Sequence, residues 1–116
     1  MDSKKSKKNI ELIERLINHN LKIIIFFQSD LTKYKILLMV MISHYQKEDQ
    51  TIEKIIEDLP KNISSRAHQL NCITDGAAKG YLLKEISKAD MRKKYLRPSE
   101  ELVIEFEEYI NIFFDK

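Results

Sequence analysis

The sequence has few of the residues that form covalent links or turns: one cysteine, two glycines, two prolines and no tryptophan among 116 residues. A lone Cys72 excludes an internal disulfide, and it provides no paired-cysteine spacing for a metal site. So few glycines and prolines argue against a loop-rich or disordered chain. Apolar residues make up 43% of the sequence, which predicts one small domain with a core of ordinary size.

Long hydrophobic segments are also missing. The longest unbroken apolar run, Ile36 to Ile42, is far too short to cross a bilayer. The first nine residues, MDSKKSKKN, are charged and contain no apolar stretch of the kind found in signal peptides. The sequence therefore predicts a cytoplasmic protein.

No recognisable catalytic motif is present. The three histidines, His19, His44 and His68, are far apart in the sequence and have no acids at the spacing of metal ligands or of a general base. The sequence contains no HExxH, no GxxxxGK[ST] and no GxSxG. We therefore expect no enzyme activity, no cofactor and no metal.

Charge is sorted along the chain although the formal net charge is only +2. Residues 61–97 contain nine basic and three acidic residues, whereas residues 98–116 contain six acids and one lysine. A segment with this positive bias attracts the phosphate backbone of a nucleic acid.

The N-terminal part predicts a basic tail followed by a helix. Residues 1–8 carry four lysines and are expected to be a flexible, solvated tail, with added contact to DNA as the alternative. Residues 9–28 show helical spacing of apolar residues, but Ile23 to Phe27 is apolar on every side. This excess predicts a partner surface, most simply a second copy of the chain. A β-strand over IIIFF is the alternative.

Two helices are predicted next. Ser29 and Asp30 are good N-caps for a helix from Leu31 to about Gln46, whose ILLMVMI centre predicts burial on all sides. Thr51 caps a short helix that extends to Leu59 before Pro60.

The basic segment begins with a third predicted helix, opened by Ser64 or Ser65 and ended by Gly80 as a left-handed residue. With Leu70 at the centre of the buried face, the residues that point outward are Ser65, His68, Gln69, Cys72 and Lys79. Two strands, 81–86 and 93–96, follow with a turn between them. Ser99 then caps a last amphipathic helix over residues 99–115.

This order of elements resembles that of the MarR-type transcriptional regulators. The matching fragments are LTKYKILLMVMI, TIEKIIEDLP, ISSRAHQLNCITDGAAKGYL and DMRKKYLRPSEEL, the last resembling the Asp-x-Arg wing of that family. The resemblance implies a mainly α fold with a small β-hairpin, a winged helix-turn-helix. A core over residues 30–97 would be flanked by dimerisation helices at 9–28 and 99–115, all within one domain of residues 9–116.

The resemblance also implies a function: sequence-specific binding of duplex DNA by a homodimer, as a nucleoid-associated transcriptional regulator. Asp90 would orient Arg92 at the wing tip, near the minor groove, and the recognition helix would enter the major groove. The implied DNA-contacting residues are Ser64, Ser65, Arg66, His68, Gln69, Lys84, Arg92, Lys93 and Lys94.

Two points of the sequence leave other functions open. The chain has one helix after the wing and little before the core, less than the dimer interface of that family usually takes, and no residue indicates a pocket for a small-molecule effector. A winged helix can instead act as a protein-interaction or assembly module. Basic rather than apolar residues in the wing favour DNA. Cys72, on the expected outer face, is a candidate redox switch.

Overall fold

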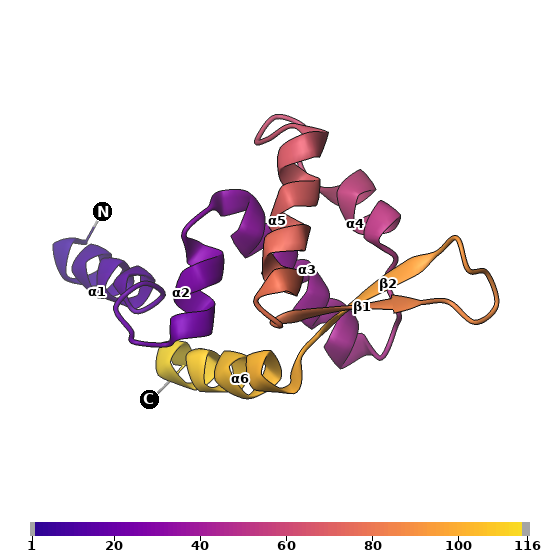
Figure 1. Ribbon diagram of the computed structural model, residues 1–116. Helices are drawn as coiled ribbons and strands as arrows, with labels where there is room; N and C mark the ends of the chain where they lie inside the picture. Colours follow the sequence, from indigo (N-terminus) through magenta and orange to yellow (C-terminus); the bar gives the residue numbers. More distant parts are fainter. Residues whose placement is uncertain (1, 115–116) are drawn as a thin grey trace.

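The computed structural model describes residues 2–114, which form six helices and one β-hairpin (Figure 1). The elements are α1 (Ser3–Glu14), α2 (Lys22–Gln28), α3 (Leu31–Gln46), α4 (Ile52–Asp58), α5 (Arg66–Ala78), β1 (Leu82–Ile86), β2 (Lys94–Pro98) and α6 (Glu100–Phe114). The fold is mainly α, a winged helix-turn-helix flanked by terminal helices, as the sequence predicts. None of the described helices is long and apolar enough to cross a membrane.

Helix α3 is the central helix, and its predicted bounds are confirmed. The carboxylate of Asp30 accepts hydrogen bonds from the backbone N–H groups of Thr32 and Lys33, so it caps the helix as expected. Ile36 and Leu37 are fully buried at its centre. The prediction of burial on all sides is wrong, because Ile42 is 56% exposed.

Residues 23–27 form a helix rather than the alternative strand. Helix α2 buries Ile23, Ile24 and Phe27 in the core. Its first turn has no side-chain cap of its own. Instead, Oε1 of Glu105 in α6 accepts from the backbone N–H groups of Ile23 and Ile24, at 2.7 and 3.3 Å. A distant carboxylate thus satisfies the open N-terminus of α2 and fixes it against α6.

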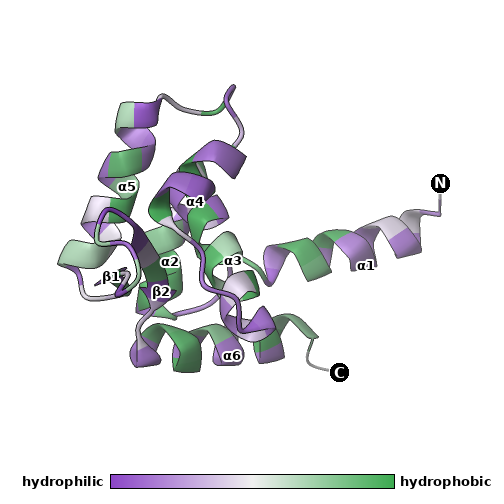
Figure 2. Ribbon diagram, turned by 90° about the vertical axis from the view of Figure 1, so that its right-hand side faces the viewer, coloured by the Kyte–Doolittle hydropathy of each residue, from purple (hydrophilic) through white to green (hydrophobic). Residues whose placement is uncertain are grey.

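The predicted helix over residues 9–28 is in fact two helices, and the expected tail is helical from Ser3. The break lies over residues 15–21, where Asn18, His19 and Asn20 are weak helix formers. His19 holds the break in place, because its Nδ1 accepts from the Leu21 N–H and its Nε2 bonds Gln28 Oε1 at 2.8 Å. Helix α1 buries no side chain and projects from the body (Figure 2).

The helix-turn-helix and wing follow the predicted signals closely. Thr51 caps α4 and Ser65 caps α5, while Gly80 has a φ of 79° just after α5 ends. The strands pair antiparallel with Lys84 opposite Leu96, and the turn between them is one residue longer than expected, over residues 87–93. Thr51 adds an isolated bridge to Tyr95, which ties the start of α4 to the wing.

Helix α6 closes the core and is capped by Ser99, whose Oγ accepts from the Leu102 N–H. It buries Leu102, Phe106 and Tyr109. Several other apolar side chains of this helix stay exposed to solvent: Ile104, Ile110, Ile112 and Phe114. The predicted end of the helix at Asp115 lies outside the described residues.

Candidate nucleic-acid interface

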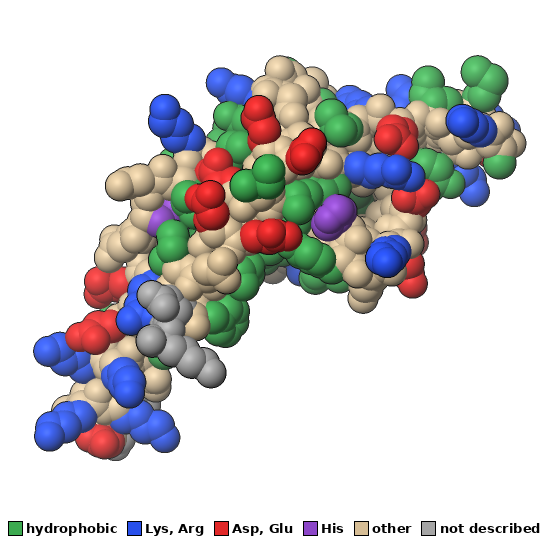
Figure 3. Space-filling view, turned by 90° about the horizontal axis from the view of Figure 1, so that it is seen from below, with side chains coloured by type: hydrophobic (Ala, Val, Ile, Leu, Met, Phe, Trp, Pro, Cys, Tyr) green, Lys and Arg blue, Asp and Glu red, His purple; other side chains and the backbone are tan. Residues whose placement is uncertain are grey.

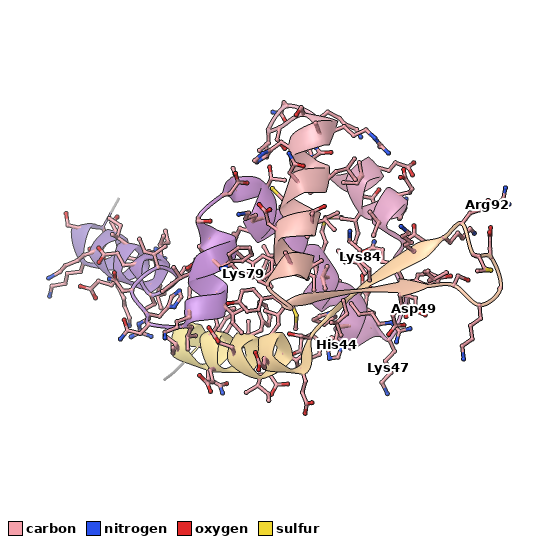
Figure 4. All side chains as sticks on the ribbon, in the orientation of Figure 1. His44, Lys47, Asp49, Lys79, Lys84 and Arg92 are labelled. Carbon is pink, nitrogen blue, oxygen red and sulfur yellow. The ribbon has the colours of Figure 1, made fainter. Side chains whose placement is uncertain are left out.

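A groove of about 520 Å³ lies between α5, α4 and the wing. Leu70 and Thr74 of α5 form one wall, and Lys84 and Lys94 of the hairpin form the opposite one. Lys84 lies near the base of the hairpin, on the stretch that passes closest to α4 and α5, whereas Arg92 lies at the far end (Figure 4). The arrangement places a helix face and a basic hairpin on the same side of the molecule.

The face of α5 that meets the core differs from the predicted one. Gln69 and Cys72 are each only 2% exposed, and Ile73 and Gly76 are buried beside them. Leu70, the predicted centre of the buried face, is 36% exposed. The prediction that Gln69 and Cys72 point outward is therefore wrong. Gln69 donates from its amide to the Ser64 carbonyl oxygen at 3.2 Å and is not available to read a base.

A glycine explains this rotation of α5. A Cβ built on Gly76 would lie 2.6 Å from Cδ1 of the buried Leu82, so a larger residue at this position would force the Leu82 side chain to move. The buried residues at positions 69, 72, 73 and 76 have the spacing of one helix face. The buried face of α5 was predicted from its apolar side chains, which favours Leu70. Gly76 has no side chain and did not contribute to that choice, so the sequence pattern indicated a different face.

The two serines before α5 have different surroundings. Ser65 is exposed, and its Oγ accepts from the His68 N–H as the N-cap. Ser64 is half-buried, and its hydroxyl bonds Oγ1 of Thr32 in α3 at 2.7 Å. Ser65 is thus placed where the N-terminus of α5 faces solvent, whereas Ser64 fixes the start of α5 to α3.

Arg66 is exposed but already has an acidic partner. Its Nη2 lies 3.1 and 3.0 Å from Oε1 and Oε2 of Glu53 in α4. Both side chains are more than half exposed, so solvent weakens this ion pair. Arg66 is therefore held across the helix-turn-helix and would have to leave Glu53 to contact another anion.

His68 lies in a cluster with Asp30 and Cys72. His68 Nε2 is 2.8 Å from Asp30 Oδ2 and 3.5 Å from Cys72 Sγ. Burial raises the pKa of Asp30, but the hydrogen bonds from His68 and from the Lys33 and Thr32 N–H groups outweigh it, and the net pKa is lowered. Burial and the Asp30 charge raise the pKa of the Cys72 thiol to about 11. A buried thiol with so little thiolate does not fit the redox-switch hypothesis.

The wing contains the contact between Asp90 and Arg92 that the resemblance implied. Oδ1 of Asp90 accepts from the backbone N–H of Arg92 at 3.1 Å and from its Nε at 3.2 Å. These hydrogen bonds, backbone first, hold the pKa of Asp90 below its ordinary value. The Arg92 side chain is 92% exposed at the hairpin tip (Figure 4), so Asp90 orients the guanidinium without covering it.

Three lysines of the hairpin form no close ion pair with a described carboxylate. Within residues 2–114, no carboxylate lies within 4.0 Å of Lys84, Lys93 or Lys94, and all three are exposed. Arg97, in contrast, pairs with Asp49 at 2.8 Å and Glu85 at 3.3 Å. The unpaired positive charge of the hairpin therefore lies on Lys84 and on the stretch around its tip.

The outward face of α5 contains residues that the sequence pattern did not select: Ala67, Leu70, Asn71 and Thr74. Asn71 is the polar side chain among them that can pair with both hydrogen-bonding groups of an adenine edge. The outward residues could have been identified from the opposite face. Treating Gly76 as a packing residue would have marked positions 69, 72, 73 and 76 as the buried face.

The comparisons with known proteins concern the fold. No family model and no curated protein matches the sequence. Among solved structures, the heme sensor protein PefR from Streptococcus agalactiae in complex with heme is 19% identical, with a TM-score of 0.53 over 96% of this chain and 76% of the PefR chain. Heme-free PefR has a TM-score of 0.48 at 16% identity, over 92% and 93% of the two chains. The likeness to the heme complex supports a MarR-like winged-helix fold for this chain.

Proposed function

We propose that this protein is a transcriptional regulator that binds duplex DNA as a homodimer, with α5 in the major groove and the wing near the minor groove. It acts by occupying its site, without catalysis. The observation that carries the proposal is the surface formed by the outward face of α5 and the unpaired basic residues of the hairpin beside it. A recognition helix beside a basic hairpin matches the docking of helix-turn-helix proteins on DNA.

Phosphate and base contacts come from different parts of this surface. Lys84, Lys93 and Lys94 are exposed point charges suited to phosphate, and Ser65 lies at the N-terminus of α5, where N–H groups favour an anion. Arg92 lies at the far end of the hairpin with its side chain in solvent, and suits insertion into a groove. Asn71 and Arg66 are the side chains of α5 that we assign to base edges, in place of Gln69.

Dimerisation is supported by apolar surface on the two terminal helices. Ile13 and Ile17, in and just after α1, are 63% and 67% exposed, and Phe114 of α6 is 65% exposed. Helix α1 has the sequence SKKSKKNIELIE, which is rich in lysine, whereas α6 has five glutamates. Seen from below, acidic and hydrophobic side chains intermingle over the middle of the molecule (Figure 3). Opposite charges and matching apolar stripes favour packing of α1 from one copy against α6 of the other.

The alternative function is a protein-interaction or assembly module. Leu70 in the groove and Met91 at the hairpin tip are exposed, and apolar side chains of this kind suit a protein partner. The basic residues around them favour DNA, because a lysine-lined surface is desolvated at a cost when it meets an apolar partner.

Titration of random and selected duplexes at several salt concentrations tests the proposal. We expect binding that weakens steeply with salt, and a selected duplex that binds at least about tenfold more tightly than random DNA. Binding without any sequence preference would reduce the function to nonspecific attachment. No binding at low salt would overturn the proposal in favour of the protein-interaction module.

A further inference from the structure

The cluster of Asp30, His68 and Cys72 joins two helices that are far apart in the sequence. Asp30 is the N-cap of α3, and His68 and Cys72 lie one turn apart near the start of α5. All three ligand atoms lie within 4.8 Å of one another. The cluster does not contribute to the proposed DNA-contacting surface, because Cys72 is buried and His68 is bonded to Asp30.

We propose that this cluster is a binding site for a thiophilic divalent cation, with Zn²⁺ as the best match. Zinc binds thiolate, imidazole and carboxylate, and this cluster supplies one of each. Magnesium and calcium match this ligand set poorly, because both ions take oxygen ligands. The spacing of His68 and Cys72, four residues apart on one helix, directs both side chains to the same side.

The distances fit a tetrahedral ion. Ligand atoms placed about 2.0–2.3 Å from zinc in a tetrahedron are separated from one another by about 3.3–3.6 Å. The distances between the residues are 3.5 Å from Cys72 Sγ to His68 Nε2 and 2.8 Å from His68 Nε2 to Asp30 Oδ2, whereas 3.9 Å separates Cys72 Sγ from the other carboxylate oxygen, Asp30 Oδ1. The separation of His68 from Cys72 already matches that of two zinc ligands, and the His68–Asp30 hydrogen bond must open by about half an ångström as the ion enters.

The surroundings leave room for a fourth ligand. Cys72 closes the inner side of the cluster, whereas the side chains of His68 and Asp30 are 44% and 30% exposed. Water reaches the outer side and completes the coordination. The N–H groups of Thr32 and Lys33 already hold Oδ1 of Asp30, and this outer hydrogen bonding orients the carboxylate. Binding displaces the thiol proton, so a proton is released as the thiolate–metal bond forms.

An occupied site would join the cap of α3 to the first two turns of α5. The free protein holds these turns by a hydrogen bond and a weak thiol contact, and a metal replaces both by coordinate bonds. Binding to the folded state alone stabilises it by mass action. We therefore expect the melting temperature to rise with Zn²⁺ concentration and amide hydrogen exchange in the first turns of α5 to slow.

Cobalt titration of the full chain, purified without an affinity tag and treated with chelator, tests the site. We expect one Co²⁺ per chain, with the visible bands of a tetrahedral ion and a thiolate-to-cobalt charge-transfer band in the near ultraviolet. Zn²⁺ added afterwards should remove both. If saturating Co²⁺ gives no charge-transfer band, Cys72 does not bind metal and the proposal is overturned.

Three variants and one control assign the ligands. Cys72→Ala should remove the charge-transfer band, and His68→Gln should weaken cobalt binding at least about tenfold. Asp30→Asn should also weaken it while keeping the N-cap, because asparagine caps as well as aspartate. His44→Gln, an exposed histidine at the other end of α3, should change nothing. Circular dichroism checks that each variant is folded, and the half-exposed His68 gives a variant that does not disturb the core. Unchanged affinity in folded His68→Gln would show that the cluster is only a hydrogen-bonded contact between helices.

Discussion

Glu53 and Arg66 form an ion pair across the helix-turn-helix, with Nη2 of Arg66 3.0 Å from Oε2 of Glu53. Glu53 also lines the groove between α5 and the wing, so an acid lies within the surface that we assign to DNA. The pair neutralises the arginine at the start of the recognition helix in the free protein.

Glu53→Gln is expected to tighten DNA binding by up to about 1 kcal/mol, because it removes a negative charge from the interface and releases Arg66. Titration of a duplex at fixed salt measures the change. Glu107→Gln makes the same change in net charge on α6 and should have a much smaller effect. Equal gains in both variants would mean that net charge alone determines the affinity.

Arg92→Ala is expected to weaken DNA binding by roughly 1–3 kcal/mol if the guanidinium inserts into a groove. The fold should be unaffected, because the side chain is 92% exposed and its partner Asp90 is within the same turn. Affinity and melting temperature should be measured together. A lower melting temperature with unchanged affinity would make Arg92 a structural residue of the hairpin.

Gln69 and Asn71 should behave differently although both lie on α5. Gln69→Ala should lower the free energy of unfolding by about 1–3 kcal/mol, because it removes a buried amide that bonds the Ser64 carbonyl oxygen. Asn71→Ala should leave stability unchanged and reduce the preference for a selected duplex over random DNA. Loss of preference in Gln69→Ala with full stability would contradict this orientation of α5.

Lys93→Ala should weaken binding to a selected duplex and to random DNA alike, and make the salt slope of binding shallower by about one unit.

Ile13→Glu is expected to separate the proposed dimer without unfolding the core, because α1 buries no side chain in its own chain. Sedimentation at micromolar concentration should give twice the chain mass for the wild type and the single mass for the variant. Met91→Glu, which places the same charge on an exposed apolar residue of the wing, serves as the control and should remain a dimer. If the wild type sediments with the mass of one chain, the protein is a monomer, and the proposal that a dimer binds two half-sites of DNA loses its support.

Acid should remove the contribution of the Asp30 charge to the free energy of unfolding. Its pKa is lower in the folded state than the ordinary 3.8, so its charged form stabilises the fold above that pH and the contribution is lost as the pH falls through the folded value. Asp30→Asn keeps the cap but cannot titrate. The difference in free energy of unfolding between the wild type and Asp30→Asn should therefore shrink as the pH falls from just above 3.8 through the lower folded pKa of Asp30. A constant difference would show that the charge of Asp30 does not stabilise the fold.

Local signals in the sequence were sufficient for most of the elements. Asp30, Thr51, Ser65 and Ser99 each cap the helix predicted for them, because a cap depends on neighbouring residues alone. The winged-helix order follows from these caps and from Gly80.

Contacts between residues that are far apart in the sequence could not be predicted from the spacing of residues within each helix. The buried face of α5 contains Gly76, which lies against Leu82 of β1. The N-terminus of α2 is capped by Glu105, more than eighty residues away. Asp30 meets His68 across 38 residues, which is why the histidines appeared to lack acidic partners. In each case the partner is determined by tertiary packing, which the spacing of residues within one helix does not encode.

In the proposed dimer, the exposure of α1 links the ordering of this helix to the concentration of the protein. A twelve-residue helix is marginal in water on its own. Because α1 buries nothing in its own chain, its helicity depends on whatever covers Ile10 and Ile13. Dilution would then lower the helical signal of this segment while the core stays folded, so that folding of the N-terminus and assembly become a single equilibrium.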